Sequence, residues 1–333
     1  MSTFTQRTST MPDLRSLVER HGPFLTASIP ARSDIAGAAD RFETQIDNAL
    51  RDAPPVWEAD VAEMRHELET LPHHDGAAVI ALRPMGGPSF YEFIDDPVHR
   101  PELTVASLPR LAPLIEARQR LISHVVVETD LAGADLVAFD SGSVAATDQV
   151  EGDTEHIHRG HPGGWSQRRF QQRAENTWES NADEVADAAR SLAHDVDARL
   201  VLVAGPTRAQ SMVATLLDER LDTPVHRVAA GDADGIAAEI VRYVADVVAS
   251  DTKALLDDFA ERIDRRATGA SDVEAALEAG RVETLLVHDD ADSRDGNELI
   301  DRCIAAALRT DADVRVVPDV AILDHGVAAI LRW

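Results

Sequence analysis

The amino-acid sequence predicts an α/β protein of three domains. A chain of 333 residues with 44% hydrophobic residues is long enough to build more than one core. From about residue 121 onward, short runs rich in Val, Leu and Ile alternate with longer segments whose apolar residues recur every three or four positions. This alternation of strand-type and helix-type segments is typical of α/β sandwiches. The predicted domains are residues 1–120, 121–231 and 232–333.

The first of these domains is predicted to be a divergent α/β domain. Residues 12–72 have a mainly helical pattern, and GAAVIALRP at 76–84 is typical of a strand. Residues 101–119 contain Pro109 and Pro113, which are expected to break the segment. This part of the chain contains no recognisable catalytic motif.

The second and third domains have clearer patterns. A long helix is expected from Ser166 to about His194, because Phe170, Ala174, Trp178 and the apolar residues after them form one stripe. A later helix is expected to end at Gly280, with Ser271 as its N-cap. Strands are predicted in the segments 122–130, 134–142, 142–152, 198–206, 225–231, 282–290, 313–318 and 327–333, and further helices in 207–221, 234–266 and 296–310.

The charge composition predicts a halophilic protein, with an ordinary acidic cytosolic protein as the alternative. The chain has 59 acidic and 32 basic residues and a net charge of −27, and Lys253 is its single lysine. Concentrated salt screens the self-repulsion that such a charge causes in dilute buffer. The single cysteine, Cys303, excludes an internal disulfide and is expected to be a small buried hydrophobe.

No apolar run approaches the length of a membrane span, and the first residues lack the apolar region of a signal peptide. We therefore expect a cytoplasmic protein that does not contact a membrane.

One stretch of the sequence departs from this acidic character. Residues 156–174, HIHRGHPGGWSQRRFQQRA, contain four arginines, three histidines and no carboxylate. Two glycines there free the backbone to approach a phosphate-lined surface closely, and arginines neutralise phosphates and stack on bases. The stretch is therefore a predicted RNA-binding loop, in which a carboxylate would be repelled. The open alternative is a basic surface loop without a ligand.

The order of residues in this stretch resembles a known pattern. Gly163, Gly164, Ser166, Arg169 and Phe170 match the Gly-Gly-x-Ser-x-x-Arg-Phe loop of archaeal and eukaryotic class-I release factors and their relatives, including Pelota. The segments VLVAGP, SDVEAALEAGRVETLLVHDD and HGVAAILRW follow in the family's order, so the resemblance covers roughly residues 121–333.

This resemblance implies a release-factor-like α/β sandwich middle domain and a ribosomal-protein-like α/β/α C-terminal domain. It also implies contact with ribosomal RNA at the peptidyl-transferase centre through one set of residues. That set is Arg159, Gly163, Gly164, Trp165, Ser166, Arg168, Arg169 and Arg173.

Two departures from the family pattern narrow the function. The family's codon-reading domain carries an Asn-Ile-Lys-Ser loop and a Tyr-x-Cys motif, and neither can exist here because Lys253 and Cys303 lie far outside the first third. This excludes a factor that reads stop codons. The family glutamine that follows the two glycines is replaced by Trp165, and Gln167 is the one candidate catalytic residue. Trp165 favours base stacking, with a hydrophobic contact at the helix start as the alternative.

Three functions remain after these departures. The first is a translation factor that occupies the ribosomal A site, as a hibernation or rescue factor in the family that includes Balon-type ribosome hibernation factors. The second is a peptidyl-tRNA hydrolase on stalled ribosomes that uses Gln167. The third is a stress-response RNA-binding protein. The resemblance implies a protein partner besides the ribosome, either an elongation-type GTPase or a recycling ATPase, and no cofactor.

No metal site is predicted. His156, His158 and His161 have metal-type spacing, but Pro162 stands where an aspartate often follows, so surface or RNA-contacting histidines are expected. The acidic run that begins at Asp290 fails as a calcium loop, because Arg294 stands at a ligand position.

Overall fold

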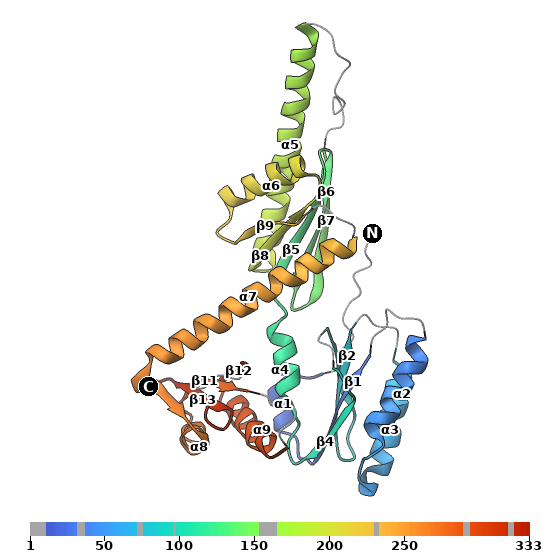
Figure 1. Ribbon diagram of the computed structural model, residues 1–333, viewed down its shortest axis with the longest axis vertical. Coiled ribbons are helices and arrows are strands. Elements are labelled where there is room, and N and C mark those ends of the chain that lie inside the picture. The colour runs from blue at the N-terminus through green and yellow to red at the C-terminus, as the bar shows by residue number, and fades with distance from the viewer. Residues whose placement is uncertain are drawn as a thin grey trace. The chain divides into compact units, whose positions relative to one another are not determined.

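The computed structural model describes residues 11–31, 37–71, 76–95, 98–152, 165–229, 233–288, 294–318 and 323–333. Within these residues the fold is of the predicted α/β type, with three separate sheets (Figure 1). Contacts group residues 120–250 into one compact unit, and the described residues of 11–119 and 251–333 into a second.

The first sheet belongs to the second unit and is antiparallel throughout, in the order β3-β2-β1-β4. Leu25 and Ala27 pack with helices α2 and α3, whereas Ile80 packs with Leu114 of α4 on the other face. The elements are α1 (Leu14–Val18), β1 (Phe24–Pro30), α2 (Ala38–Leu50), the short helix η1 (Pro55–Trp57), α3 (Glu58–Glu69), β2 (Ala78–Pro84), β3 (Phe90–Ile94), β4 (Glu102–Ala106) and α4 (Ala112–Gln119).

The structure corrects the sequence prediction for this region. Residues 12–72 are mainly helical, as predicted, but Phe24–Pro30 form the strand β1 between β2 and β4, which was not predicted. This strand is buried on both faces, so FLTASIP lacks the polar alternation of a half-exposed strand. Pro113 does not break its segment, because it stands in the first turn of α4, where a missing N–H costs no helical hydrogen bond.

The third sheet, also in the second unit, has the order β10-β13-β11-β12, with β11 and β12 parallel. Helices α8 and α9 cover one face, and Phe259 of α7 packs with Leu286 and Ile330 on the other. The elements are η2 (Ile263–Arg265), β10 (Arg266–Thr268), α8 (Ala270–Glu278), β11 (Val282–Val287), α9 (Arg294–Arg309), β12 (Asp313–Val316) and β13 (Val327–Leu331).

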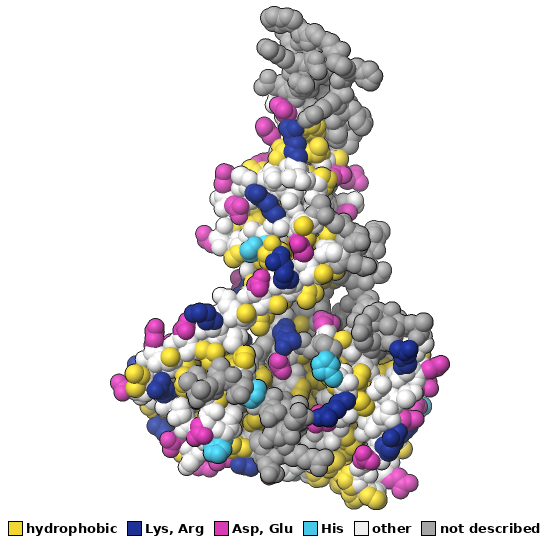
Figure 2. All heavy atoms as spheres, in the orientation of Figure 1, with side chains coloured by type: hydrophobic (Ala, Val, Ile, Leu, Met, Phe, Trp, Pro, Cys, Tyr) yellow, Lys and Arg dark blue, Asp and Glu magenta, His cyan; other side chains and the backbone are white. Residues whose placement is uncertain are grey.

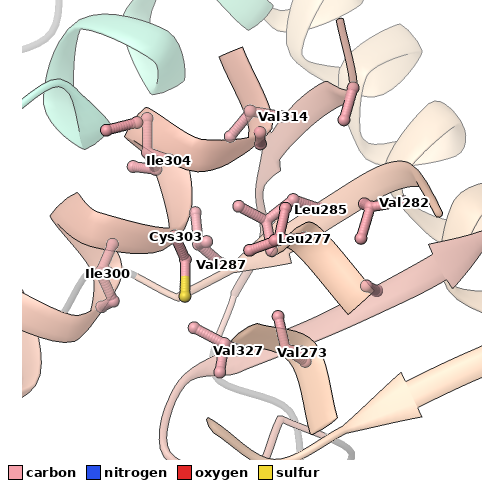
Figure 3. Close-up of a cluster of buried hydrophobic side chains, with 14 of the residues drawn as sticks. Val273, Leu277, Val282, Leu285, Val287, Ile300, Cys303, Ile304, Val314 and Val327 are labelled. Carbon is pink, nitrogen blue, oxygen red and sulfur yellow. The ribbon is translucent and has the colours of Figure 1, made fainter. Parts of the chain in front are cut away.

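The core under α8 and α9 contains Cys303, as predicted. Figure 3 shows its sulfur among the side chains of Val273, Leu277, Val287 and Val327, and Cys303 is 1% exposed. Burial raises the pKa of the Cys303 thiol to about 12, so the thiol is protonated at neutral pH.

The cap of α8 differs from the prediction. Gly269, with a φ of 84°, is the N-cap, and Ser271 lies inside the first turn; Gly280 follows the helix with a φ of 64°, which confirms the predicted glycine stop.

The first and last thirds of the chain share one core within their unit. Leu17 and Leu111 belong to the same buried cluster as Ile304 and Val316. The side chain of Gln119, the last residue of α4, donates to the Val316 carbonyl oxygen at 3.0 Å and accepts from the Val316 N–H at 2.7 Å. The Gln119 amide thus pairs with the edge strand β12 as a neighbouring strand would.

The unit of residues 120–250 is a three-layer α/β/α sandwich. Its sheet has the order β7-β6-β5-β8-β9, with β5, β8 and β9 parallel. Helices α5 and α6 cover the face of Val125 and Val127, and the first half of α7 covers the face of Val126. The elements are β5 (His124–Thr129), β6 (Gly133–Asp140), β7 (Ser143–Glu151), α5 (Trp165–Asp195), β8 (Leu200–Ala204), α6 (Thr207–Arg220), β9 (Val225–Arg227) and α7 (Ala233–Glu261).

Most of this unit follows the sequence prediction. The long helix expected from Ser166 to about His194 is α5, Trp165–Asp195. The packing also extends beyond residue 231, because Ile236, Ile240 and Val247 of α7 contact the core of this sheet.

Candidate functional site

The candidate site residues divide into two groups. Arg159, Gly163 and Gly164 lie outside the described residues, as do His156, His158 and His161. The other candidates lie on the first turns of α5, where the structure describes the helical backbone but not the side chains. They are Trp165, Ser166, Gln167, Arg168, Arg169 and Arg173.

Helix α5 carries these positions away from the core of its domain. It has 31 residues, and Trp178 is the first of its described side chains that is buried. The helix joins the sheet core from Ala182 onward. At 1.5 Å per residue, the backbone of residues 165–177 spans roughly 20 Å. Figure 1 shows this first part of α5 running past the end of the sheet formed by β5, β6 and β7.

A buried polar contact holds α5 against the end of β7, where the chain leaves the sheet. Asn181 is 3% exposed, and its Nδ2 donates to the Leu131 carbonyl oxygen at 3.0 Å. The N–H of Gly152 donates to the Ala132 carbonyl oxygen at 2.7 Å. A Cβ at Gly152 would lie 2.3 Å from Cγ of Asn181, so only glycine fits against this amide.

These contacts fix both ends of the segment that includes the predicted loop. Sequence reasoning missed Asn181 and Gly152. The available signal was an asparagine next to the apolar stripe of α5, since a polar residue at such a position is either exposed or held by buried hydrogen bonds.

Acidic residues appear again in α5 directly after the candidate residues. Glu175 is the first acidic residue after residue 156, and its Oε1 lies 3.4 Å from Nη2 of Arg208 on α6. The Arg208 guanidinium carbon lies 4.3 Å from the ring centroid of Trp178.

Elsewhere on the described surface, arginines lie beside acidic residues. Arg220 pairs with Asp183 and Asp187, and the hydrogen bond from its guanidinium to Asp183 raises the pKa of Arg220. Arg302 likewise pairs with Glu274. On the face shown in Figure 2, basic and acidic side chains are interspersed across the described residues. The acid-free stretch of residues 156–174 therefore contrasts with the pattern of the described surface.

The described residues contain no cluster of three or more His, Cys, Asp or Glu side chains that could hold a metal ion. In the same part of the chain, none of the helices has both the length and the apolar character needed to cross a membrane.

One protein-family model matches the middle part of this chain. Residues 123–265 match the model of bacterial archaeo-eukaryotic release factor family 2. The uncharacterized protein Rv2629 of Mycobacterium tuberculosis (strain ATCC 25618 / H37Rv) is 24% identical over 290 residues, which cover 82% of this chain and 77% of that protein.

The solved structures that match this chain have low sequence identity and TM-scores below 0.5. A model of ribosome-bound archaeal Pelota and ABCE1 is 15% identical, covers 98% of this chain and 96% of that chain, and has a TM-score of 0.43. The Saccharomyces cerevisiae protein Dom34, a translation termination-like factor that interacts with Hbs1, is 12% identical over 74% of this chain and 73% of that chain, with a TM-score of 0.43. The archaeal termination factor aRF1 is 18% identical over 96% of both chains, with a TM-score of 0.25.

Proposed function

Since this protein is release-factor-like, we propose that it enters the ribosomal A site in the cytoplasm and acts there as a hibernation or rescue factor. In this proposal residues 159–173 contact ribosomal RNA at the peptidyl-transferase centre. The observation that carries the proposal is the acid-free, arginine-rich stretch at the start of α5, on a helix that extends past its sheet.

The charge distribution supports this proposal. RNA repels a protein of net charge −27 unless the contacting part is basic. The three arginines at 168, 169 and 173 lie within two turns of one helix, so their backbone positions are close together. Arginines at neighbouring helix positions without carboxylates between them are suited to phosphate contact.

The residues at the start of α5 also help to decide whether the protein only occupies the ribosomal A site or hydrolyses peptidyl-tRNA there. The helix begins at Trp165, directly after the two glycines, so Gln167 belongs to its first turn. In the family the glutamine follows the glycines directly, and tryptophan cannot present an amide to a water molecule. This difference supports occupancy of the site without cleavage of peptidyl-tRNA.

Hydrolysis is the second candidate function, because Gln167 is two residues from the expected position and carries the required amide. A water molecule held by this amide and by the unpaired backbone N–H groups of the first helical turn would attack the ester bond. A stress-response RNA-binding protein that acts away from ribosomes is the weaker alternative.

We also propose that residues 1–120, 121–231 and 232–333 act as three functional domains. The third domain, by its resemblance to release factors, would contact an elongation-type GTPase or a recycling ATPase.

Cosedimentation with ribosomes in high salt, from stationary and growing cells, tests the proposal. We expect the protein in the ribosomal fraction, with more bound in stationary cells. Exclusive recovery in fractions without ribosomes would refute ribosome binding. The variant Trp165→Ala separates the two roles of the tryptophan. Loss of ribosome binding indicates base stacking, whereas loss of thermal stability alone indicates a contact at the helix start.

A further inference from the structure

Arg208 on α6 lies beside α5 near Trp178, outside the arginine-rich stretch of residues 156–174. Arg208 is the second residue of α6, and its side chain is 43% exposed. Its guanidinium stacks 4.3 Å from the ring centroid of Trp178. A guanidinium held flat on an aromatic ring is oriented in advance, so less side-chain entropy is lost when it binds a phosphate.

The sequence on both sides of Arg208 contains no acidic residue. The first turn of α6 contains no acidic residue, and residues 198–217 contain none at all. The first N–H groups of α6 also lack acceptors within the helix, because the ladder starts with the N–H of Gln210 and the Pro206 carbonyl oxygen. Unpaired N–H groups at a helix start favour an anion.

The indole of Trp178 has an unused donor. Trp178 is 5% exposed, and its Nε1 has no acceptor among the residues that the structure describes. A buried indole N–H without an acceptor costs free energy, which a phosphate oxygen that reaches the edge of the ring beside Arg208 would recover.

Among the described residues, Glu175 is the acidic side chain that pairs with Arg208, at a distance of 3.4 Å. Both side chains are about half exposed, so their pairing is weak and its loss costs little free energy. An RNA phosphate can therefore replace Glu175 as the partner of Arg208.

This position is continuous with the proposed RNA contact. Trp178 lies one helical turn from Ala174, the last residue of the acid-free stretch, and one turn from Asn181, which donates to the Leu131 carbonyl oxygen between β5 and β6. We propose that Arg208, with Trp178 and the first turn of α6, forms a second phosphate-binding point for ribosomal RNA. This inference rests on the proposed ribosome binding and extends its contact from α5 to α6.

The test compares Arg208→Met with the matched control Arg190→Met. Arg190 is also on the surface of this unit, 53% exposed and 3.7 Å from an acidic partner, Asp187. Methionine keeps the apolar part of the side chain and removes the charge. Affinity for purified ribosomes is measured over a series of salt concentrations in which a thermal melt shows each variant to be folded.

We expect Arg208→Met to weaken binding roughly fivefold and to lower the slope of log affinity against log salt by about 0.7 to 0.9, the loss of one phosphate contact. Arg190→Met is expected to change neither quantity. A salt slope for Arg208→Met equal to that of the unmodified protein overturns the second binding point and leaves the proposed function standing. An unmodified protein that binds no ribosomes overturns both.

Discussion

The paired hydrogen bonds between Gln119 and β12 give a prediction whose size follows from the structure. Gln119→Met keeps the length of the side chain and removes both bonds to Val316, at 3.0 and 2.7 Å. Val316 is 8% exposed, so its N–H and carbonyl oxygen are left without partners or must admit water. At about 1 kcal/mol for each bond, we expect the free energy of unfolding to fall by about 2 kcal/mol.

Two measurements test this prediction in high-salt buffer. Equilibrium unfolding should show the lower stability, with a midpoint about 4 to 8 °C lower for a unit of this size. Hydrogen exchange of the Val316 amide should be faster in the variant, because that N–H loses its acceptor. The control is Arg15→Met, which removes the exposed ion pair with Asp311 and should lower the stability much less than Gln119→Met does. Unchanged stability and unchanged exchange at Val316 in Gln119→Met would refute the view that this amide completes the sheet.

Three further predictions concern the proposed site and the core. Arg168→Ala combined with Arg169→Ala should weaken ribosome binding and reduce its salt dependence without unfolding the protein. Unchanged affinity would show that these two arginines do not contact the RNA. Ribosome-bound peptidyl-tRNA should release almost no peptide with this protein, and Gln167→Ala should change nothing, whereas clear release that this variant lowers about a hundredfold would establish the hydrolase. Cys303 should resist thiol reagents at neutral pH until the protein unfolds. Because burial raises the pKa of its thiol from 9.0 to about 12, its contribution to stability should be lost as pH rises from about 9 towards 12, and rapid labelling of the folded protein would contradict this.

The sequence was most informative where its local pattern and its tertiary role agreed. The apolar stripe of α5, which packs on the sheet from Ala182 onward, predicted a helix from Ser166 to about His194, within a residue of both observed ends. The strands β5 and β8 are short β-branched runs between turn residues and were also predicted.

The missed features depend on contacts between distant segments. The strand β1 is buried on both faces between strands that lie more than fifty residues further along the chain, so no local alternation identifies it. The hydrogen bonds of Gln119 to Val316 and of Asn181 to Leu131 join residues that no sequence period connects. At the candidate site, the helix was predictable from its apolar period, and the projection of α5 past the sheet was not.

The shared core of the first and last thirds has a consequence for biosynthesis. Leu17 and Leu111 pack in one cluster with Ile304 and Val316, which the ribosome adds to the chain much later. At about 5 to 20 residues per second, the roughly 200 residues between the two halves of this cluster take about 10 to 40 seconds to make. During that time the apolar side chains of α1 and α4 that will meet α9 have no partner. The nascent chain must therefore hold an incomplete domain soluble until its last strands emerge, and premature termination would leave that surface exposed.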